Sequence, residues 1–264
     1  MNKTTRSKKM NIIVFDTETI GVEKTFCYDL GYVVVNVESK TIITKKEFII
    51  EQVWSNKPLF ETAYYADKKT LYVSKMRGRK AKLVNWGMAI GAMIKDIKQY
   101  EVESAYAYNA DFDIRVFDFN ADWYKTRNPL DYVKVFDIWG YTSEAIINGL
   151  AEDYVAFANK NALTSECGNI KNNADSWGKF FYGMEWDEEH TALEDSLVEC
   201  KILLEMIERG LQVDEDYKVI KQIKSEDAPI RCLEVVEPTG EIYSFNFKSK
   251  TEYKKNGWRI VLRD

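Results

Sequence analysis

The sequence predicts an α/β protein in which a mixed sheet of five strands is flanked by helices. Three observations predict this fold class. Three β-rich runs lie within residues 11–50, and the second and third of them read as a hairpin. Strand-like and helix-like segments then alternate up to about residue 160. An amphipathic run over residues 191–210 predicts a long helix after the last strand. A hairpin followed by such alternation favours a mixed sheet.

The first half of the chain supplies three of the five strands. We expect the first in "NIIVFDTET", and the hairpin in "LGYVVVNV" and "TIITKKEFII", which are joined by "ESK". Residues 51–79 form a long polar stretch that is rich in aromatic residues. In "AKLVNWGMAIGAMIKDI" apolar residues recur at helical spacing. They are Leu83, Trp86, Ile90, Ile94 and Ile97.

The second half supplies two further strands and most of the helices. "SAYAY" and "YVKVFDIWG" predict strands, and "DFDIRVFDF" between them predicts the start of a helix. Helical material is expected up to about residue 160, and "LTSECGNIKNNADSWGKFF" predicts a loop and a short helix. "TALEDSLVECKILLEMIERG" predicts the clearest helix, which ends at Gly210. Its apolar stripe is Leu193, Leu197, Cys200, Leu204 and Ile207.

The character of the chain changes after Gly210. A charged, linker-like segment precedes three strand-like runs, "RCLEVV", "EIYSFNF" and "WRIVL", with "EPTG" as a turn. We therefore divide the 264 residues into a basic tail over 1–10, a main domain over 11–210, and a linker with a small β-rich appendage over 211–264. We expect the appendage to offer a site for a protein partner.

Composition describes an ordinary soluble protein, with 45% hydrophobic and 30% charged residues. Charged residues break every apolar run well before it could span a bilayer, and the basic start lacks a signal-peptide core. Cys27, Cys167, Cys200 and Cys232 form no CxxC pair and have no metal-ligand spacing. These features predict a protein of a reducing cytoplasm without a membrane partner. We expect that cytoplasm to be that of a bacterium or of a phage-infected host.

The net charge of −5 argues against a protein that coats nucleic acid, but it allows local phosphate contacts. Residues 67–82, "DKKTLYVSKMRGRKAK", carry seven basic residues against one acid, with Tyr64, Tyr65 and Tyr72 in or beside them. Basic residues interleaved with aromatic ones suit a single strand of nucleic acid. Taken alone, the same stretch fits a solvated loop better.

Two carboxylates stand close together at the end of the first strand. Side chains alternate along a strand, so Asp16 and Glu18 in "FDTET" point to the same face. Such a pair repels unless a cation lies between the two groups. Acids are also common where a strand runs into a solvated loop, so this pair alone is a weak signal.

A third acid follows the fourth strand. In "AYNADFDIRVF", Asp113 enters a predicted helix near the sheet edge, where sites tend to form. Asp111 fits the first turn of that helix, where the helix dipole favours an acid. Each of these two acids therefore has a structural explanation as well as a functional one.

His190 is the only histidine of the chain and lies five residues before Asp195. A lone histidine is most often a surface or satisfied core residue. However, "TALE" has the pattern of a capping box, with Thr191 as N-cap and Glu194 at the third helical position. The helix then begins at Ala192, and His190 belongs to the preceding loop. We expect this loop to bring the imidazole to the surface that Asp195 faces.

Together, "FDTET", "YNADFDIRVF" and "HTALEDSLVECKIL" resemble the three motifs of the DEDDh 3′-to-5′ exonucleases. This family includes the proofreading subunit of bacterial DNA polymerase III and ribonuclease T. The resemblance covers about residues 10–210 and leaves the appendage unexplained. It implies a ribonuclease H-like fold and release of nucleotides from the 3′ ends of single-stranded DNA or RNA, with DNA somewhat favoured. The chain departs from many members at Ile20, where they carry threonine, which bears on substrate preference.

The resemblance also implies residue roles. Asp16, Glu18, Asp113 and Asp195 would hold two Mg²⁺ or Mn²⁺ ions, and His190 would be the general base. Asp137, in "VFDIWG", receives a secondary role at most. Hard cations prefer carboxylate oxygens, and imidazole has a suitable pKa range to take a proton from the attacking water. Substrate contacts are expected from Thr17, Thr19, Asn109, Phe112, Lys75, Arg77 and Arg79.

Three other functions fit the same residues. The chain could be an exoribonuclease, a catalytically idle module that binds nucleic acid or protein, or a ribonuclease H-like endonuclease. All five motif residues are present, which argues against an idle module. The position of His190 argues against the endonuclease.

Overall fold

A computed structural model describes residues 10–165, 168–187 and 189–219, together with the backbone of three short strands near the C-terminus. The chain divides into two units. The first comprises residues 1–157 and 172–221, and the second comprises residues 158–171 and 222–264. None of the helices in the described part of the chain combines the length and the apolar character needed to cross a bilayer.

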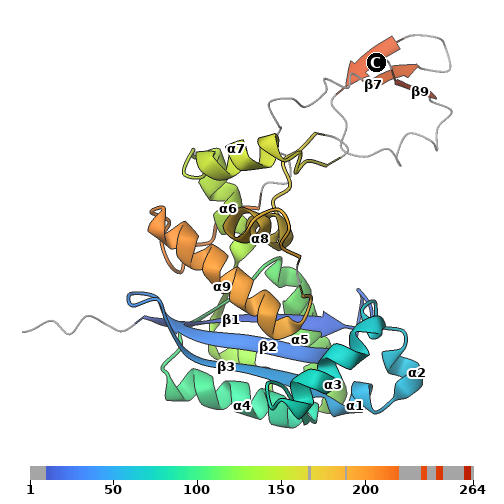
Figure 1. Ribbon diagram of the computed structural model, residues 1–264, viewed down its shortest axis with the longest axis vertical. Coiled ribbons are helices and arrows are strands. Elements are labelled where there is room, and N and C mark those ends of the chain that lie inside the picture. The colour runs from blue at the N-terminus through green and yellow to red at the C-terminus, as the bar shows by residue number, and fades with distance from the viewer. Residues whose placement is uncertain are drawn as a thin grey trace, which may run out of the picture. The chain divides into compact units, whose positions relative to one another are not determined.

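The first unit is built on a mixed sheet of six strands in the order β4-β3-β2-β1-β5-β6 (Figure 1). β1 (Asn11–Thr19), β2 (Cys27–Asn36) and β3 (Thr41–Ile50) pair antiparallel, which confirms the predicted hairpin. β5 (Ser104–Ala107) pairs parallel with β1, and β6 (Lys134–Asp137) pairs parallel with β5. The predicted α/β class is therefore confirmed.

The predicted number of five strands was wrong, because β4 (Lys82–Val84) forms a sixth strand parallel to β3. Three residues are too few to show strand periodicity, and Leu83 matched the helical stripe that follows. The helix itself, α4 (Trp86–Gln99), begins after Asn85, whose side chain accepts a hydrogen bond from the Met88 N–H group. The helix therefore begins five residues later than "AKLVNWGMAIGAMIKDI" suggested.

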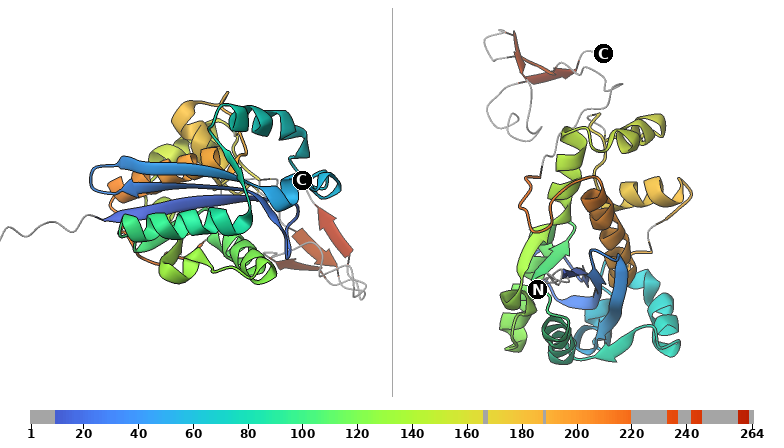
Figure 2. Two further views of the ribbon diagram at one scale, coloured as in Figure 1. Left: turned by 90° about the horizontal axis from the view of Figure 1, so that it is seen from below. Right: turned by 90° about the vertical axis from the view of Figure 1, so that its left-hand side faces the viewer.

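Helices cover both faces of the sheet (Figures 1 and 2). On one face, α4 and α5 (Ala110–Tyr124) pack against the side of β1 that carries Ile13 and Phe15. On the other face, α9 (Ala192–Glu208) crosses β1 and β2. Because residues alternate along β1, Asp16 and Glu18 emerge on the face that α9 covers.

Residues 51–79 are more structured than their polar composition indicated. They form four short helical segments, α1 (Glu51–Trp54), α2 (Lys57–Phe60), η1 (Ala66–Lys68) and α3 (Lys69–Arg77). These segments bury a second hydrophobic cluster that includes Tyr28, Phe60 and Tyr72. The interpretation of the basic stretch as a solvated loop was therefore wrong over α3, because this segment is helical and Tyr72, one of the three tyrosines in or beside the stretch, is part of the buried cluster.

The remaining helices of the first unit follow the fifth and sixth sheet strands. They are η2 (Pro129–Tyr132), α6 (Ile138–Ile147), α7 (Glu152–Lys160), whose last three residues belong to the second unit, and α8 (Ala174–Tyr182). Cys200 is buried, as its place on the α9 stripe predicted.

In the second unit, β7 (Leu233–Val236), β8 (Ile242–Phe245) and β9 (Arg259–Leu262) form an antiparallel sheet in the order β8-β7-β9. These strands match the three strand-like runs of the predicted β-rich appendage. The "EPTG" turn, most of the basic tail, most of the linker and two cysteines, Cys167 and Cys232, lie outside the described residues. The domain boundaries at residues 10 and 210 and the protein partner of residues 211–264 stay predictions.

Candidate active site

Three of the predicted metal ligands lie together where β1 ends under α9. Asp16, Glu18 and Asp195 each offer a carboxylate oxygen, and these oxygens lie within 4.8 Å of one another. Strand alternation places the first two on one face, and the first turn of α9 supplies the third. Gly31 on β2 permits the approach of this helix, since a Cβ atom there would collide with the backbone of Ala192.

The fourth predicted ligand, Asp113, reaches β1 from the opposite helix layer. Asn109 adopts a left-handed conformation (φ 61°, ψ 48°) between β5 and α5, and this turn starts the helix directly after the strand. Asp113 is buried in the first turn of α5 and accepts a hydrogen bond of 2.6 Å from the Thr17 hydroxyl group. It lies outside the group of three carboxylates, but its charge acts on Asp16.

Burial and mutual repulsion make this cluster unfavourable for ionised groups. Burial raises the pKa of Asp16 well above its usual range, and the charges of four neighbouring carboxylates raise it further. These neighbours are Asp113, Glu199, Asp195 and Glu18. Burial also raises the pKa of Asp113 to about 7, although the bond from Thr17 opposes the rise. A hard divalent cation would offset this repulsion, so the donor set fits Mg²⁺ or Mn²⁺.

Sequence reasoning missed Glu199, which lies one helical turn after Asp195 on α9. Its side chain is buried, and it accepts a hydrogen bond of 3.2 Å from the Tyr108 N–H group. It stands second among the charges that raise the pKa of Asp16. The spacing of four residues from Asp195 was the available signal, because residues i and i+4 share a helix face.

His190 lies in the loop before α9, as predicted, and α9 begins at Ala192 with Thr191 in the N-cap position. The imidazole stacks on the Tyr65 ring with a centroid distance of 4.7 Å and an interplanar angle of 13°. Burial lowers the pKa of His190, as does the charge of Lys68, while Asp187 and Asp175 act in the opposite direction.

The capping-box interpretation was wrong about the Thr191 side chain, which caps nothing on α9. Instead, the Ala192 N–H group donates to the buried carboxylate of Asp29 on β2, at 3.0 Å. The Thr191 hydroxyl oxygen accepts a hydrogen bond of 2.6 Å from the Lys75 ammonium group. The Asp29 carboxylate on β2 therefore accepts an N–H group at the start of α9, where the Thr191 side chain was expected to do so.

Several residues predicted to contact substrate have internal partners. The Thr17 hydroxyl binds Asp113, and the Thr19 hydroxyl donates to the Gly21 carbonyl oxygen at 2.6 Å. Lys75 is buried and pairs with Glu47 at 2.9 Å and with Glu189 at 3.1 Å. An ammonium group held in this way is not available to a strand, so the predicted contact of Lys75 with substrate has no support in this geometry.

The other predicted contacts are accessible to different degrees. Asn109, Arg77 and Arg79 are exposed, and Phe112 is half-buried against the α4–α5 core. The partly buried Ile20, where many family members carry threonine, packs against the second cluster.

Asp137, which was expected to have a secondary role at most in the site, has a structural task. Its carboxylate caps α6 by accepting the Trp139 N–H group at 2.9 Å. It also accepts the Asn109 N–H group at 2.9 Å, which ties the turn before α5 to β6.

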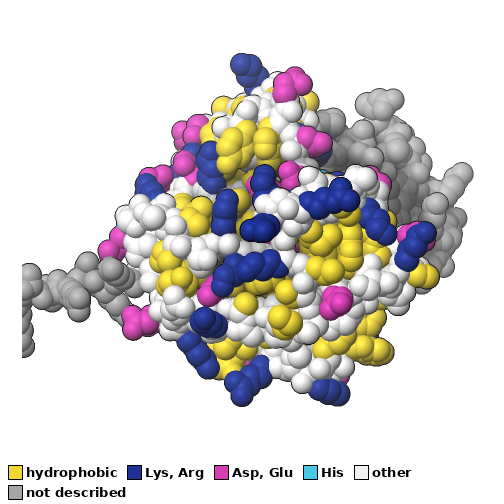
Figure 3. Space-filling model, turned by 60° about the horizontal axis from the view of Figure 1, so that its bottom comes forward, with side chains coloured by type: hydrophobic (Ala, Val, Ile, Leu, Met, Phe, Trp, Pro, Cys, Tyr) yellow, Lys and Arg dark blue, Asp and Glu magenta, His cyan; other side chains and the backbone are white. Residues whose placement is uncertain are grey.

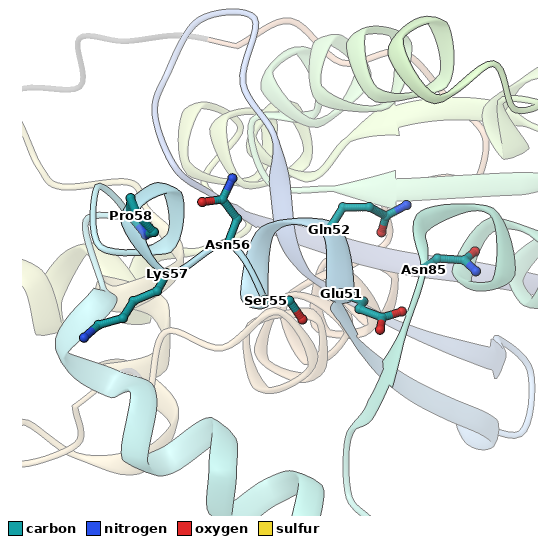
Figure 4. Close-up of a pocket in the computed structure, with 7 residues that line it drawn as sticks. All are labelled: Glu51, Gln52, Ser55, Asn56, Lys57, Pro58 and Asn85. Carbon is teal, nitrogen blue, oxygen red and sulfur yellow. The ribbon is translucent and has the colours of Figure 1, made fainter.

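A groove of about 690 Å³ lies elsewhere on the first unit (Figure 4). Residues of α1, of α2 and of the turn between them line it, together with Asn85 before α4. None of the motif residues lines this groove.

No protein-family model and no curated relative matches the sequence. Solved structures do match. The nuclease domain of 3′hExo, a DEDDh family member bound to rAMP, has a TM-score of 0.52 at 12% identity, over 82% of this chain and 99% of that one. A 3′-exonuclease in 3′-end-specific recognition of a histone mRNA stem-loop has a TM-score of 0.52 at 12% identity, over 97% and 78%.

A third similar structure, cell-death related nuclease 4 (CRN-4), has a TM-score of 0.51 at 12% identity, over 76% of this chain and 64% of that one. At such identities the likeness concerns the fold. The chain therefore has the ribonuclease H-like fold of the DEDDh-type exonucleases, in agreement with the order of its three motifs.

Proposed function

We propose that the protein is a metal-dependent 3′-to-5′ exonuclease that hydrolyses phosphodiester bonds at the 3′ ends of single-stranded nucleic acid. The observation that carries this proposal is the meeting of Asp16, Glu18 and Asp195, whose oxygens lie within 4.8 Å on a DEDDh-type fold. Asp113, tied to the same strand by Thr17, completes the set of four.

These four carboxylates would hold two divalent cations, which we expect to be Mg²⁺ or Mn²⁺. When bound, the cations would stabilise the negative charge that develops on the phosphate and would acidify the attacking water. Within the chain, Thr17 fixes one oxygen of Asp113, and the packing of α9 on β1 fixes Asp195 against Asp16. Ligands on rigid elements hold such a site more accurately than ligands on loops.

We assign His190 as the general base. Its lowered pKa keeps the imidazole neutral near pH 7, so the ring is able to accept a proton from the attacking water. The stacking contact with Tyr65 covers one face of the ring.

Cationic side chains would guide the strand. Figure 3 shows Lys and Arg side chains spread among hydrophobic ones over the face that carries α3 and α4. Arg77 and Arg79 are exposed at the end of α3, where each would neutralise a phosphate.

DNA is our first expectation for the strand, from the motifs shared with a proofreading subunit. An exoribonuclease is the second candidate, and one observation favours it. Two of the similar structures were solved with rAMP or in recognition of a histone mRNA stem-loop.

The proposal is tested with single-stranded DNA and RNA labelled at the 5′ end, each incubated with and without Mg²⁺. We expect products that shorten stepwise from the 3′ end, and no products in EDTA or with Asp195→Asn. Binding without cleavage in Mg²⁺ and Mn²⁺ would instead identify an idle module. Internal cuts in a circular strand would identify an endonuclease.

A further inference from the structure

We propose that Tyr65 and Lys75 are positioning residues. They hold the loop that carries His190, and they therefore affect kcat through the position of the general base. We call Tyr65, Lys68 and Lys75 the loop clamp. The inference rests on the proposed function, since it takes His190 as the base.

The first part of the loop clamp is a buried ammonium group. Lys75 extends from α3 and is only 6% exposed. Its Nζ atom lies 2.9 Å from Glu47 on β3, 3.1 Å from the Glu189 carboxylate and 2.6 Å from the Thr191 hydroxyl oxygen. It therefore joins the sheet to both residues that flank His190.

The second part is an aromatic stack with a cation above it. The Tyr65 ring lies nearly parallel to the imidazole, at 4.7 Å. The Lys68 ammonium group lies 4.4 Å from the centroid of the Tyr65 ring and donates to the Glu189 carbonyl oxygen at 2.5 Å. The loop clamp therefore contacts three consecutive residues of the loop. It binds the backbone and the side chain of Glu189, the imidazole ring of His190 and the hydroxyl group of Thr191.

The backbone at this point needs such support. His190 has a φ of 50°, in the left-handed region that residues other than glycine seldom adopt. Tyr182 to Glu185, which precede it, are exposed. Strained conformations persist where the surroundings fix them, and they gather at functional sites. Asp29 holds the other side of the loop through the Ala192 N–H group.

Loss of a positioning residue should lower kcat. A general base works only within hydrogen-bond reach of its proton, and a misplacement of about 1 Å can cost about 100-fold in rate. A residue that contacted the strand would instead change KM. The two roles are therefore separable by kinetics.

The first experiment compares Tyr65→Ala with Tyr65→Phe, which keeps the ring. Rates are measured on a 5′-labelled single strand that the wild type cleaves, at saturating Mg²⁺ and from pH 5 to pH 9. We expect Tyr65→Ala to lower kcat by roughly 10- to 100-fold with little change in KM, and Tyr65→Phe to remain near the wild type. In Tyr65→Ala the imidazole of His190 becomes more exposed, which reduces the burial that is the largest cause of its lowered pKa. The pKa should then rise, and the acid limb of the pH profile of kcat should move to higher pH. Lys68, Asp187 and Asp175, the charges that act on His190, remain in place.

A double-mutant cycle with His190→Asn decides whether Tyr65 acts through the histidine. We expect the combined variant to be no slower than His190→Asn alone. Additive losses, or a higher KM at unchanged kcat, would overturn the inference and make Tyr65 a strand contact.

Lys75 needs a paired change, because removal of its charge alone would leave the Glu47 carboxylate buried without it. We therefore combine Lys75→Met with Glu47→Gln and confirm folding by circular dichroism and thermal unfolding. The matched control is Arg77→Met on the same helix, whose side chain is exposed. The paired variant should lose kcat, and the control should change only KM and its salt dependence.

The inference and the proposed function fail in different ways. If the wild type cleaves no 3′ end, or if His190→Asn turns over like the wild type, the assignment of the base fails and the inference fails with it. If His190→Asn is slow while Tyr65→Ala and the folded paired variant keep wild-type kcat, the inference alone is wrong.

Discussion

The buried carboxyl group of Asp113 should make the metal-free protein less stable as the pH rises, and Asp113→Asn should remove this effect. Burial raises the pKa of Asp113 to about 7, against an ordinary value of 3.8 in an unfolded chain. A raised pKa in the folded state stabilises the fold below the unfolded value, and this contribution is lost as the pH rises through the folded value. The pH window therefore runs from about 4 to about 7.

The magnitude follows from the two pKa values. Each pH unit between them is worth about 1.36 kcal/mol, so ionisation of Asp113 removes up to about 4 kcal/mol from the free energy of unfolding. Asp113 is 2% exposed, so solvent screens little of this energy. An asparagine keeps an oxygen that accepts the hydrogen bond from Thr17 but has no charge to desolvate.

The assay is urea unfolding in EDTA at pH 4, 6 and 8, for the wild type and for Asp113→Asn. We expect the variant to gain stability relative to the wild type as the pH rises, by up to about 4 kcal/mol at pH 8. The matched control is Asp111→Asn in the same helical turn, where the side chain is 76% exposed. A difference between Asp113→Asn and the wild type that stays constant from pH 4 to pH 8 would refute the reasoning.

Four further outcomes are expected. Asp16→Ala should abolish cleavage yet leave the metal-free protein at least as stable, because it relieves repulsion; this is checked by nuclease assay and by unfolding in EDTA. His190→Ala should lower kcat by roughly 10²- to 10⁴-fold and weaken the acid limb of its pH profile, while strand binding persists. Arg77→Ala with Arg79→Ala should raise KM and flatten its dependence on salt, and an unchanged salt slope would remove both from the strand path. Gly31→Ala should cost about 1–3 kcal/mol on unfolding and lower kcat, because α9 must move away from the sheet.

Patterns within single elements made much of this architecture predictable. Period-two alternation placed Asp16 and Glu18 on one face, and the capping-box pattern placed the start of α9 at Ala192, although the Thr191 side chain does not make the cap. The hairpin was readable because both strands are long and the connection is short. The strand β4 was not predicted, because three residues are too few to show the two-residue alternation of a strand.

Interactions between residues far apart in the sequence were not predictable. Lys75 looked like a surface cation within a basic run, yet Glu47, Glu189 and Thr191 surround its ammonium group. Lysine is usually exposed, so a basic run in the sequence predicts surface side chains. The partners that allow a lysine to be buried come from tertiary structure. The local capping signal failed for the same reason, since the cap of α9 comes from Asp29, 163 residues away.

The first turn of α9 links the two halves of the proposed chemistry. At one end of this turn, Ala192 contacts Asp29 while Thr191 and Glu189 contact Lys75, so the loop of His190 is tied to β2, β3 and α3. At its other end, Asp195 joins the carboxylates of β1. Both ends depend on how closely the helix approaches β2, and Gly31 sets that approach by its missing side chain. A shift of α9 would therefore move a metal ligand and the base together, whereas release of the loop clamp would move the base alone. Measurement of metal affinity together with kcat distinguishes the two cases. A shift of α9 should lower both, whereas release of the loop clamp should lower kcat alone.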